Sequence, residues 1–290
     1  MKTHLDRICL TIIFFSLYPF PCLAQSNRYL NGRIMKELNA DSGYISARNR
    51  MTREFDQTKP GAWGEFVNGV KVRFDSHNKS IALTFDACGG PKSSGYDSAL
   101  IAFLQTQKIH ATLFITGKWI DANYSNFLKL AKDTFFEIEN HGLNHKPCSF
   151  CGAMAYGIKG TVNSKAAYDE IEANTIKIKK ITGRKPGIYR SATAYIDEAS
   201  VQMAGKMGYI VISYDVLSTD AMPALPAEEI KQTVLQHIHP GAIVIMHFNH
   251  PEWNTLKAMK LLIPELRKQG YSFVILKNQS LLPRKRKVKH

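Results

Sequence analysis

Short runs of β-branched, aromatic and aliphatic residues recur along the chain from about residue 80 onward. Polar or glycine-containing stretches bound these runs, which is typical of buried β-strands. The pattern predicts seven strands, at Ile81–Phe85, Ala111–Ile115, Phe136–Asn140, Gly187–Arg190, Tyr209–Tyr214, Ala242–His247 and Ser272–Leu276.

Amphipathic segments of helical length lie between these runs. The clearest are Asp97–Thr106, Lys165–Thr182, Glu198–Met207, Glu228–His237 and Thr255–Gln269. Gly183, Gly208 and Gly270 follow three of them, at the position where helices commonly end in a left-handed residue. Because strands alternate with helices, we expect a parallel sheet.

The alternation favours an α/β fold, and specifically a distorted seven-stranded parallel βα barrel, over a sandwich. An open doubly wound sheet is the structural alternative. We assign the barrel to residues 76–282. Residues 25–75 show only weak periodicity and are expected to form an N-terminal extension that packs on the barrel, and residues 283–290 form a basic tail.

Residues 1–24 have the organisation of a signal peptide. Lys2 and Arg7 precede an apolar run, Ile8–Leu17, which is shorter than the about 20 residues of a membrane-spanning helix. Small residues then end at Ala24, where we expect cleavage. The sequence thus predicts an exported protein, periplasmic or secreted, with no transmembrane segment in the mature chain; an uncleaved anchor is the alternative.

The composition changes this picture only through its charge. The 290 residues are 44% hydrophobic and 21% charged, which excludes a disordered, collagen-like or coiled-coil protein. Lys and Arg number 38 against 24 Asp and Glu, a net charge of +14 that favours an anionic partner such as a cell-wall polymer. Nucleic acid is not an expected partner, because the sequence contains no recognised nucleic-acid-binding module.

Titratable side chains follow the predicted strands at their carboxyl ends, which is where parallel βα barrels carry their function. These side chains are Asp86, His141, His145, Arg190, Asp220 and His247. Any one of them alone would more often have a structural role, but the set together indicates a catalytic site.

The histidines are spaced so that both imidazoles can bind one metal ion. His141 and His145 lie four residues apart, and a divalent metal bound there would lower the pKa of a water molecule and polarise a carbonyl group. Asp86 would accept the proton of that water, and His247 would protonate a leaving amine. The set predicts metal-assisted hydrolysis of an amide or an ester.

In their order, these residues resemble the five motifs of the NodB-homology polysaccharide deacetylases, carbohydrate esterase family 4, from about residue 63 to residue 277. Residues 84–89 read Thr-Phe-Asp-Ala-Cys-Gly and match a subgroup with Thr-Phe-Asp-Ala-Cys-Gly-Gly in this place. Asp220 matches the fourth motif, although Ala221 replaces the expected tryptophan. The other motifs are residues 141–145, His-Gly-Leu-Asn-His, residues 189–193, Tyr-Arg-Ser-Ala-Thr, and residues 245–247, Ile-Met-His.

The resemblance implies a NodB-like barrel and a secreted, metal-dependent hydrolase of carbon–nitrogen bonds. It would remove N-acetyl groups from an N-acetylhexosamine polysaccharide such as peptidoglycan or a chitin-like polymer. The resemblance also implies that Asp86 is the base and His247 the acid. Arg190 would orient Asp86, and Asp220 would in turn hold Arg190.

Metal and substrate ligands follow from the same resemblance. His141 and His145 would bind the metal, with zinc expected and cobalt or nickel as alternatives. The backbone N–H near Thr193 would fall at the oxyanion hole. Trp253, which follows the sixth predicted strand, is the aromatic residue that we expect to stack on a sugar.

The first motif departs from the family at the third metal ligand, usually a second aspartate, which is Ala87 here. Cys88 is a candidate substitute, because a thiolate binds zinc well. For an exported protein, however, we favour a disulfide between Cys88 and either Cys148 or Cys151.

Other interpretations of the site remain open. His141, His145, Cys148 and Cys151 are together a candidate for a closed structural zinc site. Ala87 motivates a glycan-binding member of the fold with weakened catalysis. A hydrolase of small amides or cyclic imides is a further alternative, which the N-terminal extension and the basic charge disfavour.

Overall fold

The structure is a computed structural model and describes residues 29–284. The predicted signal peptide and residues 285–290 of the basic tail lie outside the described residues. Among residues 29–284, no helix is both long and apolar enough to cross a membrane.

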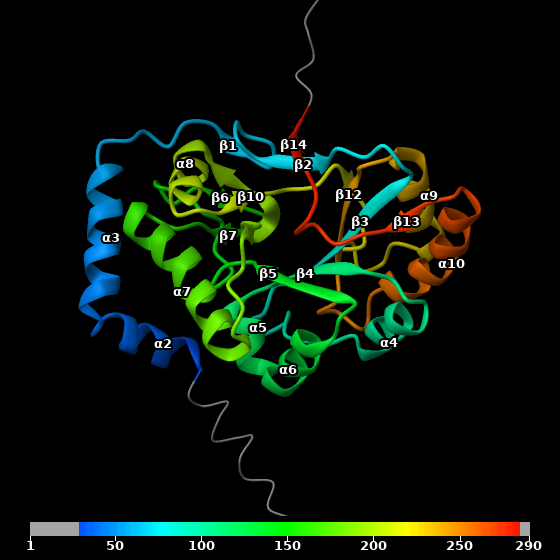
Figure 1. The fold of residues 1–290 in the computed structure, drawn as a ribbon, viewed down its shortest axis with the longest axis horizontal. Coiled ribbons are helices and arrows are strands. Elements are labelled where there is room, and N and C mark those ends of the chain that lie inside the picture. Colours follow the sequence, from blue (N-terminus) through cyan, green and yellow to red (C-terminus); the bar gives the residue numbers. More distant parts are fainter. Residues whose placement is uncertain (1–28, 285–290) are drawn as a thin grey trace, which may run out of the picture.

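Seven parallel strands form one curved sheet in the order β10–β8–β5–β4–β3–β12–β11 (Figure 1). Buried β-branched and aromatic residues fill the central strands, which accounts for their burial on both faces. The strands are β3 (Ser80–Ala87), β4 (Ala111–Ile115), β5 (Phe136–Asn140), β8 (Ile188–Tyr189), β10 (Ile210–Val211), β11 (Val216–Leu217) and β12 (Ile243–His247). This sheet confirms the predicted distorted seven-stranded barrel.

The barrel is completed at its open side by strands outside the main sheet. β2 (Lys71–Phe74) bridges the segment after β10 and the segment before β12, because Ser213 N donates to Lys71 O at 2.8 Å and Phe74 N donates to Gly241 O at 2.9 Å. β14 (Leu281–Pro283) pairs with β2 in antiparallel fashion. β13 (Ser272–Phe273) pairs only with the first two residues of β3, so it lies off the path of seven strands to which the sequence assigned it.

Helices cover the outer face of the sheet, as the alternating pattern predicts. Asp97 accepts a hydrogen bond from Leu100 N at 2.8 Å and thus caps the first helix of the barrel. Gly183, Gly208 and Gly270 have positive φ angles of 76°, 88° and 83°, which confirms the expected helix ends. The helices are α4 (Ser98–Thr106), α5 (Gly117–Ala122), α6 (Tyr124–Lys132), α7 (Ser164–Thr182), α8 (Glu198–Lys206), α9 (Ala227–His237) and α10 (Thr255–Lys268).

Residues ahead of the barrel fold into two helices, α2 (Asn31–Leu38) and α3 (Ser42–Glu54), which lie against α7 (Figure 1). Only Ile34 and Leu38 of α2 are buried, so the apolar stripe of this short helix is too sparse to give a clear sequence signal.

A buried lysine joins α2 to the barrel. Lys177 donates to Asn31 Oδ1 at 2.6 Å and to Gly117 O at 2.8 Å. Asn31 in turn donates through Nδ2 to Leu143 O at 2.8 Å. Leu143 lies between the two histidines of the predicted metal site, so the N-terminal helices support the loop that carries them.

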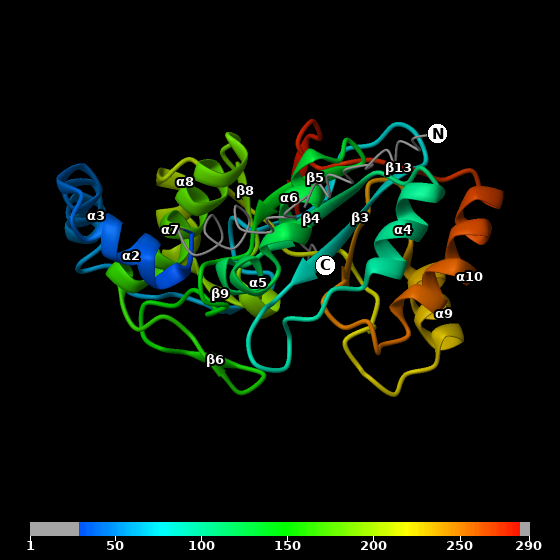
Figure 2. The same ribbon diagram turned by 90° about the horizontal axis from the view of Figure 1, so that it is seen from below.

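The sequence pattern did not predict β11, the helices α5 and α6, or the β6–β7 hairpin. β11 has two residues, and α5 and α6 are separated by Asn123 alone. A hairpin of two-residue strands, β6 (Met154–Ala155) and β7 (Ile158–Lys159), interrupts the region between β5 and α7. Figure 2 shows this hairpin projecting on the side where β3 ends. The two-residue strands and the six-residue helix α5 carry too few residues for periodicity to register.

Apolar side chains fill the interior of the barrel below its carboxyl-terminal edge. The buried members of this core are Phe74, Ala82, Phe114, Ile188, Ile212, Ile243 and Leu276. A larger cluster packs the sheet against α4, α5, α6 and α10. Above this apolar cluster, polar side chains meet at the ends of β3, β5, β8 and β12.

Candidate active site

Asp86 lies at the end of β3 with 2% of its surface exposed. Arg190 donates through Nη1 to its Oδ1 at 2.7 Å and through Nη2 to Ser213 O at 2.8 Å. The guanidinium group also lies over the Phe114 ring, 4.2 Å from its centroid. Burial alone would raise the pKa of Asp86, but Arg190, His141 and His247 together outweigh it and hold that pKa below its usual range. Asp86 is therefore an ionised, oriented carboxylate, as the sequence predicts.

His141 follows β5 and is almost fully buried beside Asp86. Its Nδ1 lies 2.9 Å from Arg190 O, and a carbonyl can only accept, so Nδ1 carries the proton. Its Nε2 is left to face Asp86 Oδ2 at 3.6 Å, beyond hydrogen-bond distance. In metal-binding histidines, one ring nitrogen typically donates to a carbonyl or carboxylate, as Nδ1 does here, and the other nitrogen is left free for the metal.

His145 stands on a loop that a buried glutamate organises. Glu170 Oε1 accepts hydrogen bonds from Asn144 N at 2.9 Å and Lys146 N at 3.0 Å, the residues on either side of His145. Gly142 permits this approach, because a Cβ there would lie 2.5 Å from Glu170 Oε1. The sequence analysis missed Glu170, although a carboxylate on the apolar face of the predicted helix was an available signal.

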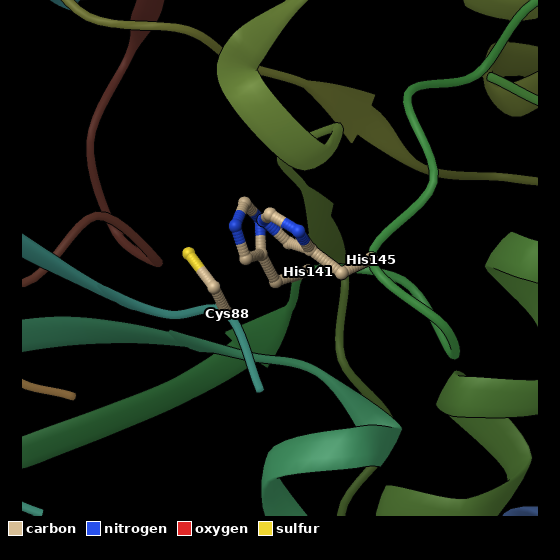
Figure 3. Close-up of side chains that lie close together, drawn as sticks. All are labelled: Cys88, His141 and His145. Atoms are coloured by element: carbon tan, nitrogen blue, oxygen red, sulfur yellow. The ribbon is translucent and has the colours of Figure 1, made fainter. Parts of the chain in front are cut away.

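Cys88 meets the two histidines, as Figure 3 shows: its thiol, from the end of β3, faces both imidazoles. The donor atoms of Cys88, His141 and His145 all lie within 4.8 Å of one another. The Nε2 atoms of both histidines are buried and have no hydrogen-bond partner among residues 29–284. One sulfur and two imidazole nitrogens form a donor set that suits zinc and leaves a fourth position open.

The favoured disulfide is therefore wrong. Cys88, Cys148 and Cys151 are all free thiols. Cys148 is buried with its Sγ 3.0 Å from the Tyr189 hydroxyl, and Cys151 is exposed beside Ser149. Cys88 lies beside the two histidines, whereas Cys148 contacts Tyr189 and Cys151 contacts Ser149, so the three thiols have different neighbours.

The closed zinc site built from both histidines and the Cys148–Cys151 pair is not formed either. Among the residues the structure describes, the histidines group with Cys88 instead. Burial would raise the pKa of the Cys88 thiol, but the neighbouring imidazoles, His145 foremost, hold it well below its usual range.

His247 ends β12 in direct register with Asp86 on β3. Its Nδ1 donates to Asp220 Oδ1 at 3.0 Å, and its backbone N–H donates to Asp220 Oδ2 at 2.7 Å. Thr255 Oγ1 also donates to Asp220 Oδ2, at 3.0 Å. Burial would lower the pKa of His247, yet Asp220 holds it well above its usual range. His247 is thus a cationic donor beside Asp86.

The expectation that Asp220 fixes Arg190 is corrected by these contacts. Asp220 orients His247, while Arg190 is held by Ser213 O and the Phe114 ring. The reason is β11, which the sequence pattern did not reveal: it places the residues after it beside β12 rather than beside β8.

A cavity of about 600 Å³ opens above these groups. Thr193 and Trp253 both line it, as expected, and Thr193 has a positive φ of 62°. Such strain in a non-glycine residue is concentrated at functional sites. Trp253 stacks on His250 at 3.8 Å between ring centroids, so one of its faces is already covered.

A second cavity, of about 470 Å³, adjoins the first on the side of the loop at residues 89–93. Five residues line both cavities: Cys88, His145, Ile158, His247 and Trp253. The candidate site therefore lies at the middle of an extended depression and not at the bottom of a single closed pocket.

The first cavity also includes residues that the sequence analysis missed. Glu65 enters from the N-terminal extension, Tyr156 from the β6–β7 hairpin and Tyr214 from the segment after β10. All three stand in loops or very short strands, where no periodic or motif signal marked them.

The βα barrel carries a carboxylate, a histidine and a thiol–histidine group at its strand ends, and with the relatives below it defines the class of the protein: a hydrolase. Residues 74–212 match the family described as polysaccharide deacetylase. This match confirms, over these residues, the resemblance to the NodB-homology polysaccharide deacetylases that the sequence motifs indicate.

Two proteins are similar to this chain in sequence, and one solved structure is similar to it in fold. A peptidoglycan-N-acetylglucosamine deacetylase of Bacillus cereus is 27% identical over 201 residues, which are 69% of this chain and 87% of that protein. An uncharacterized 30.6 kDa protein of Geobacillus stearothermophilus is 24% identical over 277 residues, 91% of this chain and 90% of its own. A solved carbohydrate esterase family 4 pseudoenzyme from Bacillus anthracis shares the fold, with a TM-score of 0.60 at 23% identity over 71% of this chain and 66% of that one.

Proposed function

We propose that the protein is a metal-dependent N-deacetylase of an N-acetylhexosamine polysaccharide. The observation that carries this proposal is the strand register that sets Asp86 beside His247, with Cys88, His141 and His145 grouped next to them. A base, an acid and a candidate metal position at one end of a cavity are what hydrolysis of an amide requires. The B. cereus relative, named as a deacetylase of peptidoglycan, supports the substrate class.

Cys88, His141 and His145 would hold the metal, with zinc the expected ion. When bound there, a divalent ion would activate a water molecule and polarise the acetyl carbonyl. Cys88 would supply the anionic ligand that Ala87 cannot, because Ala87 is fully buried at the end of β3 and offers no donor atom. The free Nε2 atoms of the histidines support this assignment.

Asp86 would take the proton of the attacking water, since Arg190 keeps one carboxylate oxygen occupied and leaves the other directed toward His141. His247 would give a proton to the amine that leaves, with Asp220 holding the imidazole through Nδ1 so that Nε2 faces the cavity. The backbone N–H near Thr193 would stabilise the negative charge that develops on the acetyl oxygen.

The two adjoining cavities support a polymeric substrate, because a chain can lie across a site from one to the other. The basic composition supports an anionic cell-wall polymer such as peptidoglycan, and a chitin-like polymer fits the same site. Export to the periplasm or the medium, after cleavage near Ala24, completes the proposal.

Acetate release tests the function. Purified mature protein would be incubated with peptidoglycan and with chitooligosaccharides, with chelator and after restoring zinc, cobalt or nickel. We expect release that chelator stops and metal restores. Absence of release from both polymers, with each metal present, contradicts the proposal.

A glycan-binding protein with weakened catalysis is the second candidate, and Ala87 is the observation that favours it. The B. anthracis pseudoenzyme has the same fold. Sugar binding without acetate release, in protein shown to contain metal, would select this alternative.

A further inference from the structure

One wall of the first cavity combines a carboxylate with two phenols. Glu65 follows β1 (Trp63–Gly64), which pairs with β9 (Ile196–Asp197) and so fixes the extension against the barrel. Tyr156 Oη donates to Glu65 Oε1 at 3.5 Å, and Tyr214 lines the cavity beside them. None of these residues takes part in the hydrolytic machinery.

Tyr156 occupies the tip of the β6–β7 hairpin in a conformation that its side chain disfavours. Tyr156 and Gly157 have φ angles of 49° and 75°, a pair of positive values typical of a type I′ turn. Gly, Asn and Asp are the usual residues there, and a bulky residue at positive φ is strained. The ring is nevertheless 76% exposed, so burial does not compensate for this strain. An exposed aromatic ring held in a strained turn beside a cavity indicates a ligand contact.

The base of the hairpin is rigid. Gly152 N donates to Thr161 O at 2.9 Å, and Gly160 N donates to Ala153 O at 2.9 Å. Thr161 Oγ1 donates to Ser149 O at 2.5 Å. The ring of Tyr156 is therefore presented at a set distance from the site instead of being carried on a loose loop.

Three aromatic rings contact one another in succession, starting with Tyr156. Tyr195 meets the Tyr156 ring edge-on at 5.7 Å between centroids, and the Trp63 ring lies 5.7 Å from that of Tyr195. Tyr and Trp offer an apolar face together with a hydrogen-bonding edge. Pyranose rings carry apolar C–H faces and polar rims, so this row has the chemistry of a surface for saccharide units.

Charge distinguishes this side of the depression from the other. Glu65 is the charged residue beside Tyr156, while Lys92 lines the second cavity. A carboxylate accepts hydrogen bonds from hydroxyl, amide or ammonium groups and repels another carboxylate. The Glu65 side therefore suits a sugar with hydroxyl and amino or acetamido groups.

We propose that Glu65 and Tyr156 form a second sugar position, which binds a neutral or amine-bearing hexosamine unit next to the one that reacts. The proposal rests on the proposed function, because the same polymer must occupy both positions. Tyr156 stacks on the ring of that unit, and Glu65 accepts hydrogen bonds from its hydroxyl or amino groups. The position makes the enzyme prefer oligomers to single sugars.

Binding and turnover together test this position. Chitotetraose and N-acetylglucosamine would be titrated by calorimetry into metal-loaded Asp86→Asn protein, and kcat/KM would be measured for both sugars and for a small aryl acetate in the active protein. The variants are Glu65→Gln and Tyr156→Asn, because Asn suits the positive φ and removes the ring without adding strain to the turn. Met154→Ala, in the same hairpin and 58% exposed outside the cavity, is the matched control.

We expect each of the two variants to weaken chitotetraose binding and kcat/KM about tenfold, mainly through KM, with the aryl acetate and the control unchanged. Tyr156→Phe should keep the affinity for the tetramer. Unchanged tetramer affinity in both variants, or equal losses on tetramer and aryl acetate, overturns the second sugar position. Tetramer binding that depends on Glu65 and Tyr156 without acetate release would retain it and reject the deacetylase function instead.

Discussion

His247 on β12 is the direct partner of Asp86 on β3, so the acid and the base of the proposed reaction stand side by side on neighbouring parallel strands. Each is held by a residue from elsewhere: Arg190 contacts Asp86 and Asp220 contacts His247. The Arg190–Asp86 pair is buried and the Asp220–His247 pair is largely buried, so each member orients the other and removing one leaves an uncompensated charge. The two pairs thus fix opposite protonation states at adjacent positions.

Asp86→Asn should lower acetate release by a factor of about 10² to 10⁴, the usual contribution of a positioned general base. Asn has nearly the same shape and still accepts a hydrogen bond from Arg190, but it cannot take a proton. Metal content measured on the same preparation should stay at the level of the parent protein. Retained release at full metal content would reject Asp86 as the base.

Asp220→Asn should lower kcat more than it raises KM. Asn keeps a carbonyl oxygen for the Thr255 hydroxyl but no longer supplies the charge that holds His247 protonated. Steady-state kinetics on chitotetraose would separate the two parameters. Ser218→Ala, which removes another donor to Asp220 without changing its charge, is the control. Equal kinetics for both variants would mean that Asp220 acts only through packing.

Cys88→Ser should weaken metal binding markedly, since an alcohol replaces a thiolate donor. In cobalt-substituted protein, the parent should show thiolate-to-metal charge-transfer absorption that the variant lacks. The control is Cys151→Ser, because Cys151 is exposed and stands apart from the histidines. Identical cobalt spectra for parent and Cys88→Ser would exclude sulfur ligation.

The long strands made the positions of the candidate site residues predictable from sequence. β3, β5 and β12 have at least five residues each, so their ends, and therefore Asp86, His141 and His247, could be located from the apolar runs. Parallel strands bring their carboxyl ends to one edge of the barrel. These residues could therefore be expected to lie close together before any contact between them was known.

Contacts made through short elements could not be predicted in the same way. The two residues of β11 decide that Asp220 meets His247 and not Arg190, and Cys88 meets the histidines because β3 continues through Ala87. Glu65 follows a two-residue strand placed by its long-range pairing with β9, and Tyr156 stands at the tip of a hairpin of two-residue strands. Periodicity carries no information on such pairings.

At the opposite end of the barrel, Glu139 gives a prediction for stability. It is 5% exposed, and its Oε2 accepts hydrogen bonds from Gly187 N at 3.0 Å and Ile188 N at 2.7 Å. Burial, with the nearby Glu137 charge, raises the pKa of Glu139 from 4.5 to about 8. The folded protein therefore keeps a proton that the unfolded chain releases between these two values.

The sign of the pH dependence follows from this difference. Because the folded state binds the extra proton, the stability contributed by Glu139 is complete below pH 4.5 and is lost as pH rises through about 8. The free energy of unfolding should fall by up to about 1.4 kcal/mol per pH unit in this window.

Glu139→Gln keeps an oxygen acceptor and cannot ionise, so it should flatten the slope and be more stable than the parent protein at pH 8.5. Urea unfolding across pH 5 to 8.5 would measure this, with exposed Glu229→Gln as the control. Parallel slopes for parent and Glu139→Gln would show that Glu139 is already ionised in the folded protein at neutral pH.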